Sequence, residues 1–250
     1  TQVLIAGGDN CANTTALTSW DLWDSTALST TLPVSSTATG PGTNKLTVGR
    51  RLFTATVVGT GKVLLAGGAA ATATADIFTL NATTPASSTI PATALVMTGT
   101  RFGHTATLLT STTATIACPS APTASCVLLA GGNATPGKTW EIYDGSTDTF
   151  PLNAATGGTN HDLVTLARQL HAAAVFAGGK VLLAGGSNGA TAQSTTEVFD
   201  PAATTLSFTT GVGLQLARFR TAALYAPLQD VLVLVGGNTV GPSTEQVTTP

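Results

Sequence analysis

The sequence contains few charged residues. Asp, Glu, Lys and Arg make up only 9% of its 250 residues, and the formal net charge is -2 at pH 7. It has no run of Lys or Arg that could bind a phosphate backbone or an anionic membrane surface. The composition therefore predicts that nucleic acid is not a partner.

Long hydrophobic runs are absent as well. The longest apolar stretches have about five to seven residues. Because a membrane-spanning helix needs about 20 residues, we expect no transmembrane helix. Thr1 falls inside a repeat unit described below, so we also expect further sequence before it, including any targeting signal.

Cysteine is scarce too, with three residues in the chain. Cys118 and Cys126 flank the segment CPSAPTASC between two expected strands. A hairpin there would bring their Cα atoms within the roughly 4.4 to 6.8 Å that a disulfide requires. We expect a disulfide, and hence an oxidising location that is extracellular, at the cell surface or periplasmic. The alternative is two free thiols in a cytosolic loop, and the role of Cys11 stays open.

The sequence is rich in hydrophobic residues and threonine. Hydrophobic residues make up 43% of the chain, which is enough for a sizeable core. Threonine is abundant, and its β-branched side chain packs well on a pleated sheet but less well in a helix. The composition therefore favours strands over long helices.

A short hydrophobic segment that ends in two glycines occurs five times. The copies are VLIAGG at 3–8, VLLAGG at 63–68, 127–132 and 181–186, and VLVGG at 233–237. Successive glycine pairs are 60, 64, 54 and 51 residues apart. Such regular recurrence is typical of an internal repeat.

Two further features recur in phase with the glycine pairs. An Arg opens a hydrophobic segment ahead of four pairs, and an acidic residue lies near the start of the segment after each pair. The arginines are Arg51, Arg101, Arg168 and Arg218, and the acidic residues are Asp21, Asp76, Glu141, Glu197 and Glu245. The segment led by the Arg is strand a, the segment ending in the glycine pair is strand b and the acidic segment is strand c. A weaker fourth segment is strand d, so each unit contains four short strands. The glycine pair ends strand b, where we expect positive φ angles and the close approach of another backbone.

These units predict an all-β fold. Four-stranded antiparallel sheets arranged around an axis leave only short edges exposed, and this arrangement is a β-propeller. We expect one propeller domain over 1–250, with five repeats at approximately 1–49, 50–99, 100–166, 167–216 and 217–250. The first unit lacks strand a and the last lacks strand d. The chain is therefore either part of a ring of six or seven blades, which we favour, or a ring of five that closes imperfectly.

The unit resembles the kelch repeat. Its hydrophobic run ending in Gly-Gly, its acidic segment with an aromatic residue and its period near 50 residues are similar to that motif. The stretch RFGHTATLL at 101–109 resembles the kelch-like propellers of secreted bacterial proteins. The resemblance covers essentially the whole chain and implies a propeller similar to the central domain of galactose oxidase. It leaves the function open, because kelch propellers serve as substrate adaptors, actin binders, sugar-binding modules and copper-oxidase domains.

We interpret the recurring charges as structural. Each Arg is expected to pair with an acidic residue of its own or the neighbouring blade, because an unpaired charge in a protein interior costs several kcal/mol. The alternative is a ring of arginines that lines a central channel and binds an anion. His104 and His171 share one position of strand a, where Thr54 and Thr221 stand in other copies. We therefore expect buried polar side chains bonded to the backbone there, rather than a metal site.

Candidate ligand-binding residues lie in the loops between strands b and c, and in the insertions around Cys118 and His161. Trp20 and Trp140 stand at the exits of two such loops, where they could stack on a sugar ring. Packing between blades is the alternative for both. The remaining candidates are Asn133, His161, Asp162, Asn188 and Asn238.

The sequence offers no catalytic motif. It contains no G-x-S-x-G elbow, phosphate-binding loop or zinc signature, and we expect no metal or other cofactor. The resemblance implies that a copper oxidase would need two Tyr, two His and a Cys, but Tyr143 and Tyr225 both fall at core positions of the repeat.

The functional prediction is a non-catalytic, extracytoplasmic binding or scaffold module. It would recognise a protein or glycan through its loops, within a longer chain that carries further blades or domains. One alternative is the propeller part of a secreted oxidase or hydrolase whose catalytic residues lie outside this chain. The other is a structural spacer.

Overall fold

The protein folds into five antiparallel sheets, each built from strands that follow one another in the sequence. The computed structural model describes residues 2–9, 15–24, 34–35, 45–68, 73–84, 87–109, 125–132, 137–152, 163, 166–238 and 244–248. Within this part of the chain, no helix has the length and hydrophobicity of a membrane span.

We number the sheets as blades 1 to 5 in chain order. Blade 1 contains β1 (Gln2–Ala6), β2 (Trp20–Asp24) and β3 (Val34–Ser35). Blade 2 contains β4 (Thr54–Gly59), β5 (Lys62–Ala66), β6 (Thr74–Thr79) and β7 (Leu95–Val96). Blade 3 contains β8 (Thr105–Leu109), β9 (Cys126–Ala130), β10 (Trp140–Asp144) and β11 (Thr149–Leu152). Blade 4 contains β12 (Ala172–Val175), β13 (Val181–Ala184), β14 (Thr196–Phe199) and β15 (Phe208–Thr210), with a short 3-10 turn, η3 (Ala177–Gly179), after β12. Blade 5 contains β16 (Ala222–Ala226), β17 (Val231–Val235) and β18 (Thr244–Thr248).

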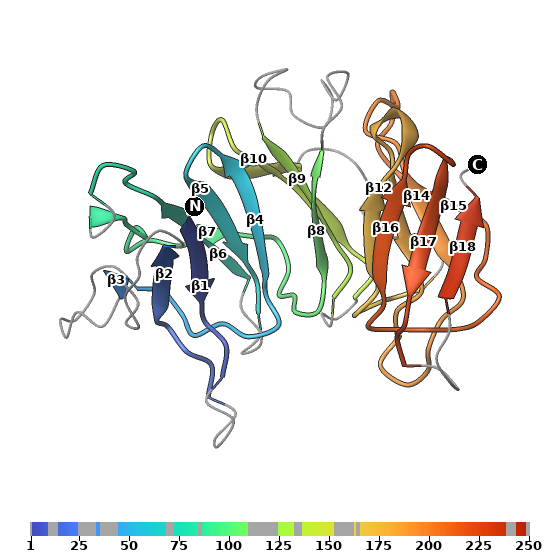
Figure 1. Ribbon diagram of the computed structural model, residues 1–250, viewed down its shortest axis with the longest axis horizontal. Helices are drawn as coiled ribbons and strands as arrows, with labels where there is room; N and C mark the ends of the chain where they lie inside the picture. The colour runs from blue at the N-terminus through green and yellow to red at the C-terminus, as the bar shows by residue number, and fades with distance from the viewer. Residues whose placement is uncertain are drawn as a thin grey trace.

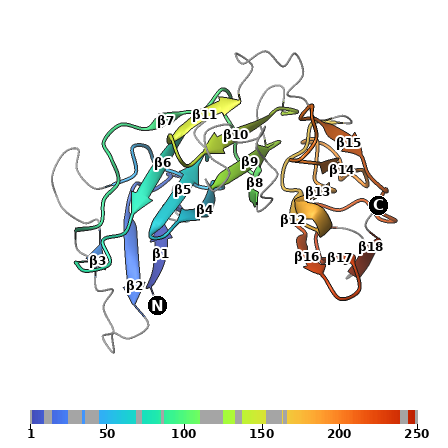
Figure 2. The same cartoon turned by 90° about the horizontal axis from the view of Figure 1, so that it is seen from above.

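The blades stand side by side in an arc (Figure 1). Seen from above, blade 1 and blade 5 form the two ends of this arc (Figure 2). The strands β4, β8, β12 and β16 lie next to one another on its inner side. The predicted all-β propeller of four-stranded blades, with incomplete first and last blades, is confirmed. In blade 1 the sheet begins with β1, which is the counterpart of strand b in the other blades.

Neighbouring blades share hydrophobic cores. Strand b contributes to two cores at once, because its side chains alternate between the two faces of the blade. In β5, Leu64 packs toward blade 3 and Leu65 packs toward blade 1. This explains why strand b is hydrophobic at nearly every position. Four such cores hold the five blades together.

The glycine pairs turn the chain at the end of each strand b. All ten glycines have φ between 60° and 117°. In blades 1 to 4, a Cβ on the first glycine would lie within 3.0 Å of the carbonyl oxygen of an arginine in the following blade. The second glycine donates its N–H to the same oxygen, for example Gly132 to Arg168 at 2.8 Å. Only glycine permits both the turn and this close approach.

Candidate functional site at the propeller axis

Each four-stranded blade contains one buried pair of an arginine and an acidic residue. Arg50 bonds Asp76 at 2.9 Å, Arg101 bonds Glu141 at 2.7 Å and Arg168 bonds Glu197 at 2.8 Å. All six side chains are 0% exposed. Charge pairing and hydrogen bonding offset the cost of removing these groups from water.

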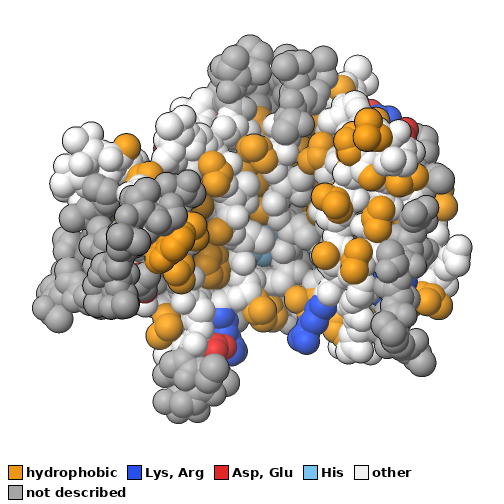
Figure 3. Space-filling model, viewed as in Figure 1, with side chains coloured by type: hydrophobic (Ala, Val, Ile, Leu, Met, Phe, Trp, Pro, Cys, Tyr) orange, Lys and Arg blue, Asp and Glu red, His pale blue; other side chains and the backbone are white. Residues whose placement is uncertain are grey.

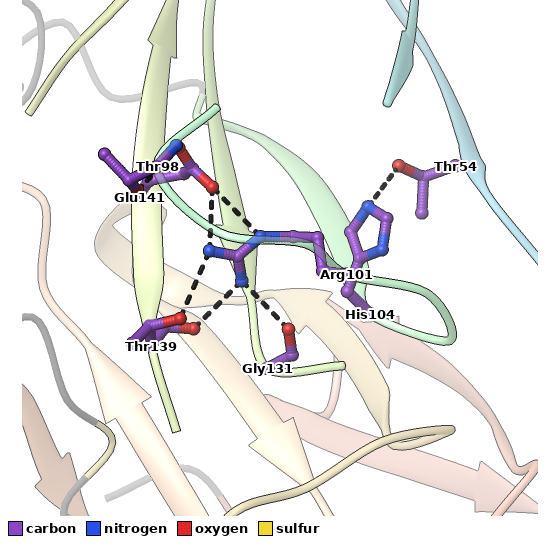
Figure 4. Close-up of polar contacts among 7 residues, drawn as sticks. All are labelled: Thr54, Thr98, Arg101, His104, Gly131, Thr139 and Glu141. Atoms are coloured by element: carbon purple, nitrogen blue, oxygen red, sulfur yellow. Dashed lines mark hydrogen bonds and ion pairs between the residues drawn. The ribbon is translucent and has the colours of Figure 1, made fainter. Parts of the chain in front are cut away.

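The guanidinium groups also bond the backbone of their own blade. Arg101 donates to the carbonyl oxygen of Gly131 at 2.9 Å and to that of Thr139 at 3.0 Å (Figure 4). The carbonyl oxygen of Arg101 itself accepts from Gly68 of the preceding blade. Each arginine therefore fixes the end of strand b in two successive blades.

The assignment of Arg51 to this set is wrong. Arg50 is the buried arginine, whereas Arg51 is 34% exposed and pairs with Asp9 at 3.3 Å. A threonine three residues ahead of the buried arginine could have decided between them. Thr47 and Thr98 both donate to the carboxylate that the arginine binds.

Blade 5 carries the same arrangement in part. The buried Arg218 donates to the carbonyl oxygen of Gly236 at 3.1 Å. Glu245 lies opposite Leu234 in β18, in the register that Glu197 has with Leu183 in blade 4. The side chain of Glu245 is outside the described residues, so its pairing stays a prediction.

The two histidines link successive inner strands. His104 Nε2 lies 2.9 Å from the hydroxyl of Thr54, and His171 Nε2 lies 2.8 Å from that of Thr105. Both partners are side chains of the preceding blade, not the backbone groups that we expected. The prediction that Thr54 shares the position of His104 is wrong by one residue, because Phe53 approaches Gly7 as His104 approaches Gly67.

Both histidines are neutral near pH 7. Burial, followed by the charge of Arg168, lowers the pKa of His171 to about 3. Burial, Arg101 and His171 together lower the pKa of His104 well below its ordinary value. Among the described residues, no group of three or more His, Cys, Asp or Glu is placed to hold a metal ion.

A chain of backbone hydrogen bonds runs around the axis. It joins the residues two positions after each buried arginine, namely Leu52, Gly103, Leu170 and Arg220. The N–H of each donates to the carbonyl oxygen of the one before it, at 2.9, 2.6 and 2.7 Å. All four have positive φ angles, between 54° and 63°. Sequence reasoning missed this feature, because leucine and arginine give no signal for a left-handed backbone.

These residues surround a cavity of about 280 Å³, which we call the axial pocket. Its lining is completed by the next residue in each blade: Phe53, His104, His171 and Thr221. Leu52 and Arg220 are exposed beside it, and the guanidinium of Arg220 lies 5.7 Å from the Phe219 ring centroid. The pocket thus combines an apolar wall, neutral imidazoles and one cation. A histidine surface is visible at the base of the hollow between the two halves of the molecule (Figure 3).

The loops between strands b and c begin on the same face. Asn238 donates its N–H to the carbonyl oxygen of Phe219 at 2.8 Å, directly beside Arg220. Ser187 and Gln169 exchange two backbone hydrogen bonds of 2.8 and 2.9 Å in blade 4. The axial pocket and these loop starts therefore form one continuous surface.

The structure separates the predicted ligand-binding residues into three groups. Trp20 and Trp140 are 1% and 2% exposed and pack edge-to-face on Phe78 and Phe199. Stacking on a sugar is therefore wrong for both, because the cores between blades already cover their rings. Asn188 and Asn238 are exposed beside the loop starts, and the Asn188 side chain accepts from the N–H groups of two residues in its own loop. Asn133, His161 and Asp162 lie outside the described residues.

Cys126 is disulfide-bonded. Cys11 and Cys118 both lie outside the described residues, so the pairing with Cys118 stays a prediction.

A comparison with protein-family models places one repeat in a known family. The model of the Kelch motif matches residues 170–205, which span β12 to β14 of blade 4. Blade 4 therefore contains a kelch motif. The other blades keep the same strand register, the same glycine pair and the same acidic position as this one. A search of curated proteins found no match.

Proposed function

We propose that this protein is a non-catalytic binding or scaffold module whose partner docks on the face around the axial pocket. The kelch motif indicates a protein-interaction propeller module. The axial pocket is the observation that supports the location. It gathers residues from four blades around a hollow whose apolar wall and single cation suit a partner side chain.

Two exposed residues of the pocket have the chemistry of interface anchors. Leu52 is 55% exposed, and the exposed Arg220 has its guanidinium over the Phe219 ring, with no ion pair to another described residue. Arginine is one of the residues that most often dominate the binding energy of protein interfaces, and Leu52 adds exposed apolar area beside it. Because Trp20 and Trp140 are buried, the structure offers neither as a platform for a sugar. We therefore favour a protein partner over a glycan, and an apolar or acidic side chain as the group that enters the pocket.

The test is selection of binders from a displayed protein library and from a glycan array, followed by affinity measurement with variants. Arg220→Ala should weaken binding by about tenfold or more, and Leu52→Ser should weaken it by a smaller but measurable factor because it removes apolar contact area. Leu228→Ser is the matched control, because Leu228 is 94% exposed in the turn at the opposite end of β16. Binders that respond equally to all three changes would rule out the axial face as the site.

We also propose an extracytoplasmic location. The disulfide at Cys126 supports it, because disulfides persist in oxidising compartments. Peptide mapping without reduction, on protein isolated from its own cells, should find Cys126 joined to Cys118. Free thiols at all three cysteines would contradict both the pairing and the location.

A further inference from the structure

The junction between blades 2 and 3 departs from the repeat. In blade 4, Lys180 precedes strand b and pairs with Asp200 after strand c of the same blade, at 3.3 Å. Lys62 holds the equivalent position in blade 2, but the residue opposite it in strand c is Thr79. Lys62 instead reaches the next blade, where its ammonium lies 2.7 Å from both carboxylate oxygens of Asp148. This charge pair therefore bridges two blades, whereas its counterpart stays within one.

A tyrosine completes the cluster. The hydroxyl of Tyr143 donates to Asp148, which lies in the turn between β10 and β11. Phe78 and Phe199 stand at the position of Tyr143 in blades 2 and 4. Burial and the hydrogen bond to Asp148 raise the pKa of Tyr143, so its hydroxyl stays protonated as a donor. The fold explains residues that recur in every unit, but it does not explain a cluster found at this junction.

A cavity of about 470 Å³ opens beside the cluster. Both Lys62 and Asp148 line it, in the region where β7 and β11 lie side by side (Figure 2). Lys62 begins β5, and the glycine pair follows the other end of this strand. The cavity is therefore at the opposite end of the blades from the axial pocket. Its volume falls in the range of about 300–1,000 Å³ that is usual for small-molecule sites.

The lining combines hydroxyl groups with an apolar floor. Within the described residues, no hydrogen bond uses the hydroxyls of Thr60, Thr79 and Thr93, which are exposed around the cavity. The apolar floor is formed by Ile77, Pro91 and Leu95. A ligand that fits this lining has both hydrogen-bonding groups and a face of C–H groups.

The charge pair keeps part of its bonding capacity. The side chain of Lys62 is 28% exposed and that of Asp148 is 40% exposed. A carboxylate has about four acceptor positions and an ammonium has three donors, and the pair and Tyr143 use part of each. The two charges cancel, so the described lining does not favour an ionic ligand. A hydroxyl group can accept from the ammonium and donate to the carboxylate at the same time.

We propose that this cavity binds a neutral saccharide unit. The sugar hydroxyls bond Asp148 and Lys62, and hydrogen bonds to charged groups are the strong ones in such a site. The threonine hydroxyls bond the remaining sugar oxygens, and the C–H face of the ring packs on the apolar floor. The site shares no residue with Trp20, Trp140 or the loops between strands b and c. It is a second site, beyond the proposed function of the axial pocket.

Saturation-transfer-difference NMR on the whole chain tests the proposal. The probes are glucose, galactose, mannose and N-acetylglucosamine, each also as a disaccharide, and at least one should give a saturable signal. Asp148→Asn removes the charge but suits the φ of 52° at this position, because Asn tolerates the left-handed region. It should weaken binding by about tenfold or more, since it removes a hydrogen bond to a charged group.

A second variant acts through Lys62. Thr79→Asp gives Lys62 a partner within its own blade, as Asp200 is for Lys180, and so withdraws the ammonium from Asp148. It should also weaken binding by about tenfold or more. Asp200→Asn is the matched control, because it breaks the half-exposed pair of blade 4 and should leave binding unchanged. Near-UV circular dichroism verifies that each variant is folded.

The absence of a saturable signal from every sugar up to about 10 mM would overturn the proposal. The cluster would then serve to fasten blade 2 to blade 3, and Asp148→Asn would lower only the free energy of unfolding. Binding that survives both changes, or that weakens equally with Asp200→Asn, would show that the sugar binds elsewhere and would overturn it too. Arg220→Ala should leave sugar binding unchanged, so failure of this proposal leaves the proposed function of the axial pocket intact.

Discussion

At the residue scale, single side chains connect neighbouring blades. The arginine of one blade holds its own glycine pair through the guanidinium, and the preceding pair through its carbonyl oxygen. The histidines add a side-chain bond between inner strands. The loss of one such residue therefore affects two blades, which is why these positions recur in a chain with so little charge.

Breaking one buried charge pair should destabilise the protein strongly. Glu141→Gln leaves the guanidinium of Arg101 buried without its counter-charge, and we expect the free energy of unfolding to fall by about 3–5 kcal/mol. Urea denaturation followed by tryptophan fluorescence measures the change. Lys180→Ala is the control, because Lys180 and Asp200 form a half-exposed pair and should contribute about 0–1 kcal/mol. A small effect of Glu141→Gln would mean that the pair is not buried as described.

The histidines should make stability depend on pH. In the unfolded chain both titrate near the ordinary pKa of 6.5, whereas in the folded protein the pKa of His171 is about 3 and that of His104 is well below 6.5. Between these values the unfolded state binds more protons, so stability is full above about pH 6.5 and falls as the pH drops toward 3.

The variant that tests this carries His104→Gln and His171→Gln together. Its free energy of unfolding should fall less steeply below pH 6.5 than that of the original protein, by up to about 1.4 kcal/mol per pH unit for each histidine. Urea titrations at several pH values give both slopes. Identical slopes would show that the imidazoles are not held neutral by the fold.

At the element scale, the glycine pair is the device that ends strand b. The positive φ angle turns the chain, and the missing Cβ admits the arginine carbonyl oxygen of the next blade. Blade 5 has the same turn but no arginine carbonyl oxygen beside it, since no described atom lies within 4 Å of a Cβ built on Gly236. The two roles of the glycine can therefore be separated experimentally.

Gly131→Ala and Gly236→Ala make the matched comparison, because their φ angles are 63° and 69°. Gly236→Ala should cost only the left-handed backbone strain of about 1–2 kcal/mol. Gly131→Ala should cost clearly more, because its Cβ meets the carbonyl oxygen of Arg168. Midpoints of urea unfolding rank the two variants. Equal losses would show that the close approach contributes nothing.

At the scale of the whole molecule, stability should vary along the arc. Each inner blade buries both of its faces against neighbours, whereas blades 1 and 5 bury one face each within the described structure. In repeat proteins stability is roughly a sum of unit and interface contributions. Blades at the ends of the arc should therefore open more often than blades in the middle.

Native-state hydrogen exchange tests this with β13 and β17. Both strands are paired on two sides, so their amides differ mainly in the number of blade faces covered. We expect the amides of β17 to exchange faster than those of β13. Leu234→Ala, in the core between blades 4 and 5, should speed exchange in β17 while that of β9 in blade 3 changes little. Uniform protection across the five blades would mean that the arc unfolds as one unit.

Local chemistry accounts for the parts of the site that the sequence predicted and the parts it did not. The glycine pairs predict the turns from the sequence alone, because few other residues accept positive φ angles at two successive positions. Arg50 and Arg51 are adjacent and chemically identical, so only the position of the whole strand decides which is buried. Trp20 stands at a loop exit in the sequence, which suggests a sugar-stacking residue, but its ring is buried in the core between two blades.

The amino-acid sequence by itself determined the repeat, the all-β class, the strand order within a blade and the left-handed turns, because each of these depends on residues close together in the chain. The tertiary structure decided which arginine is buried, which tryptophans are covered, and how Leu52, Gly103, Leu170 and Arg220 meet around the axial pocket. These properties depend on contacts between blades about 50 residues apart, which no local pattern encodes.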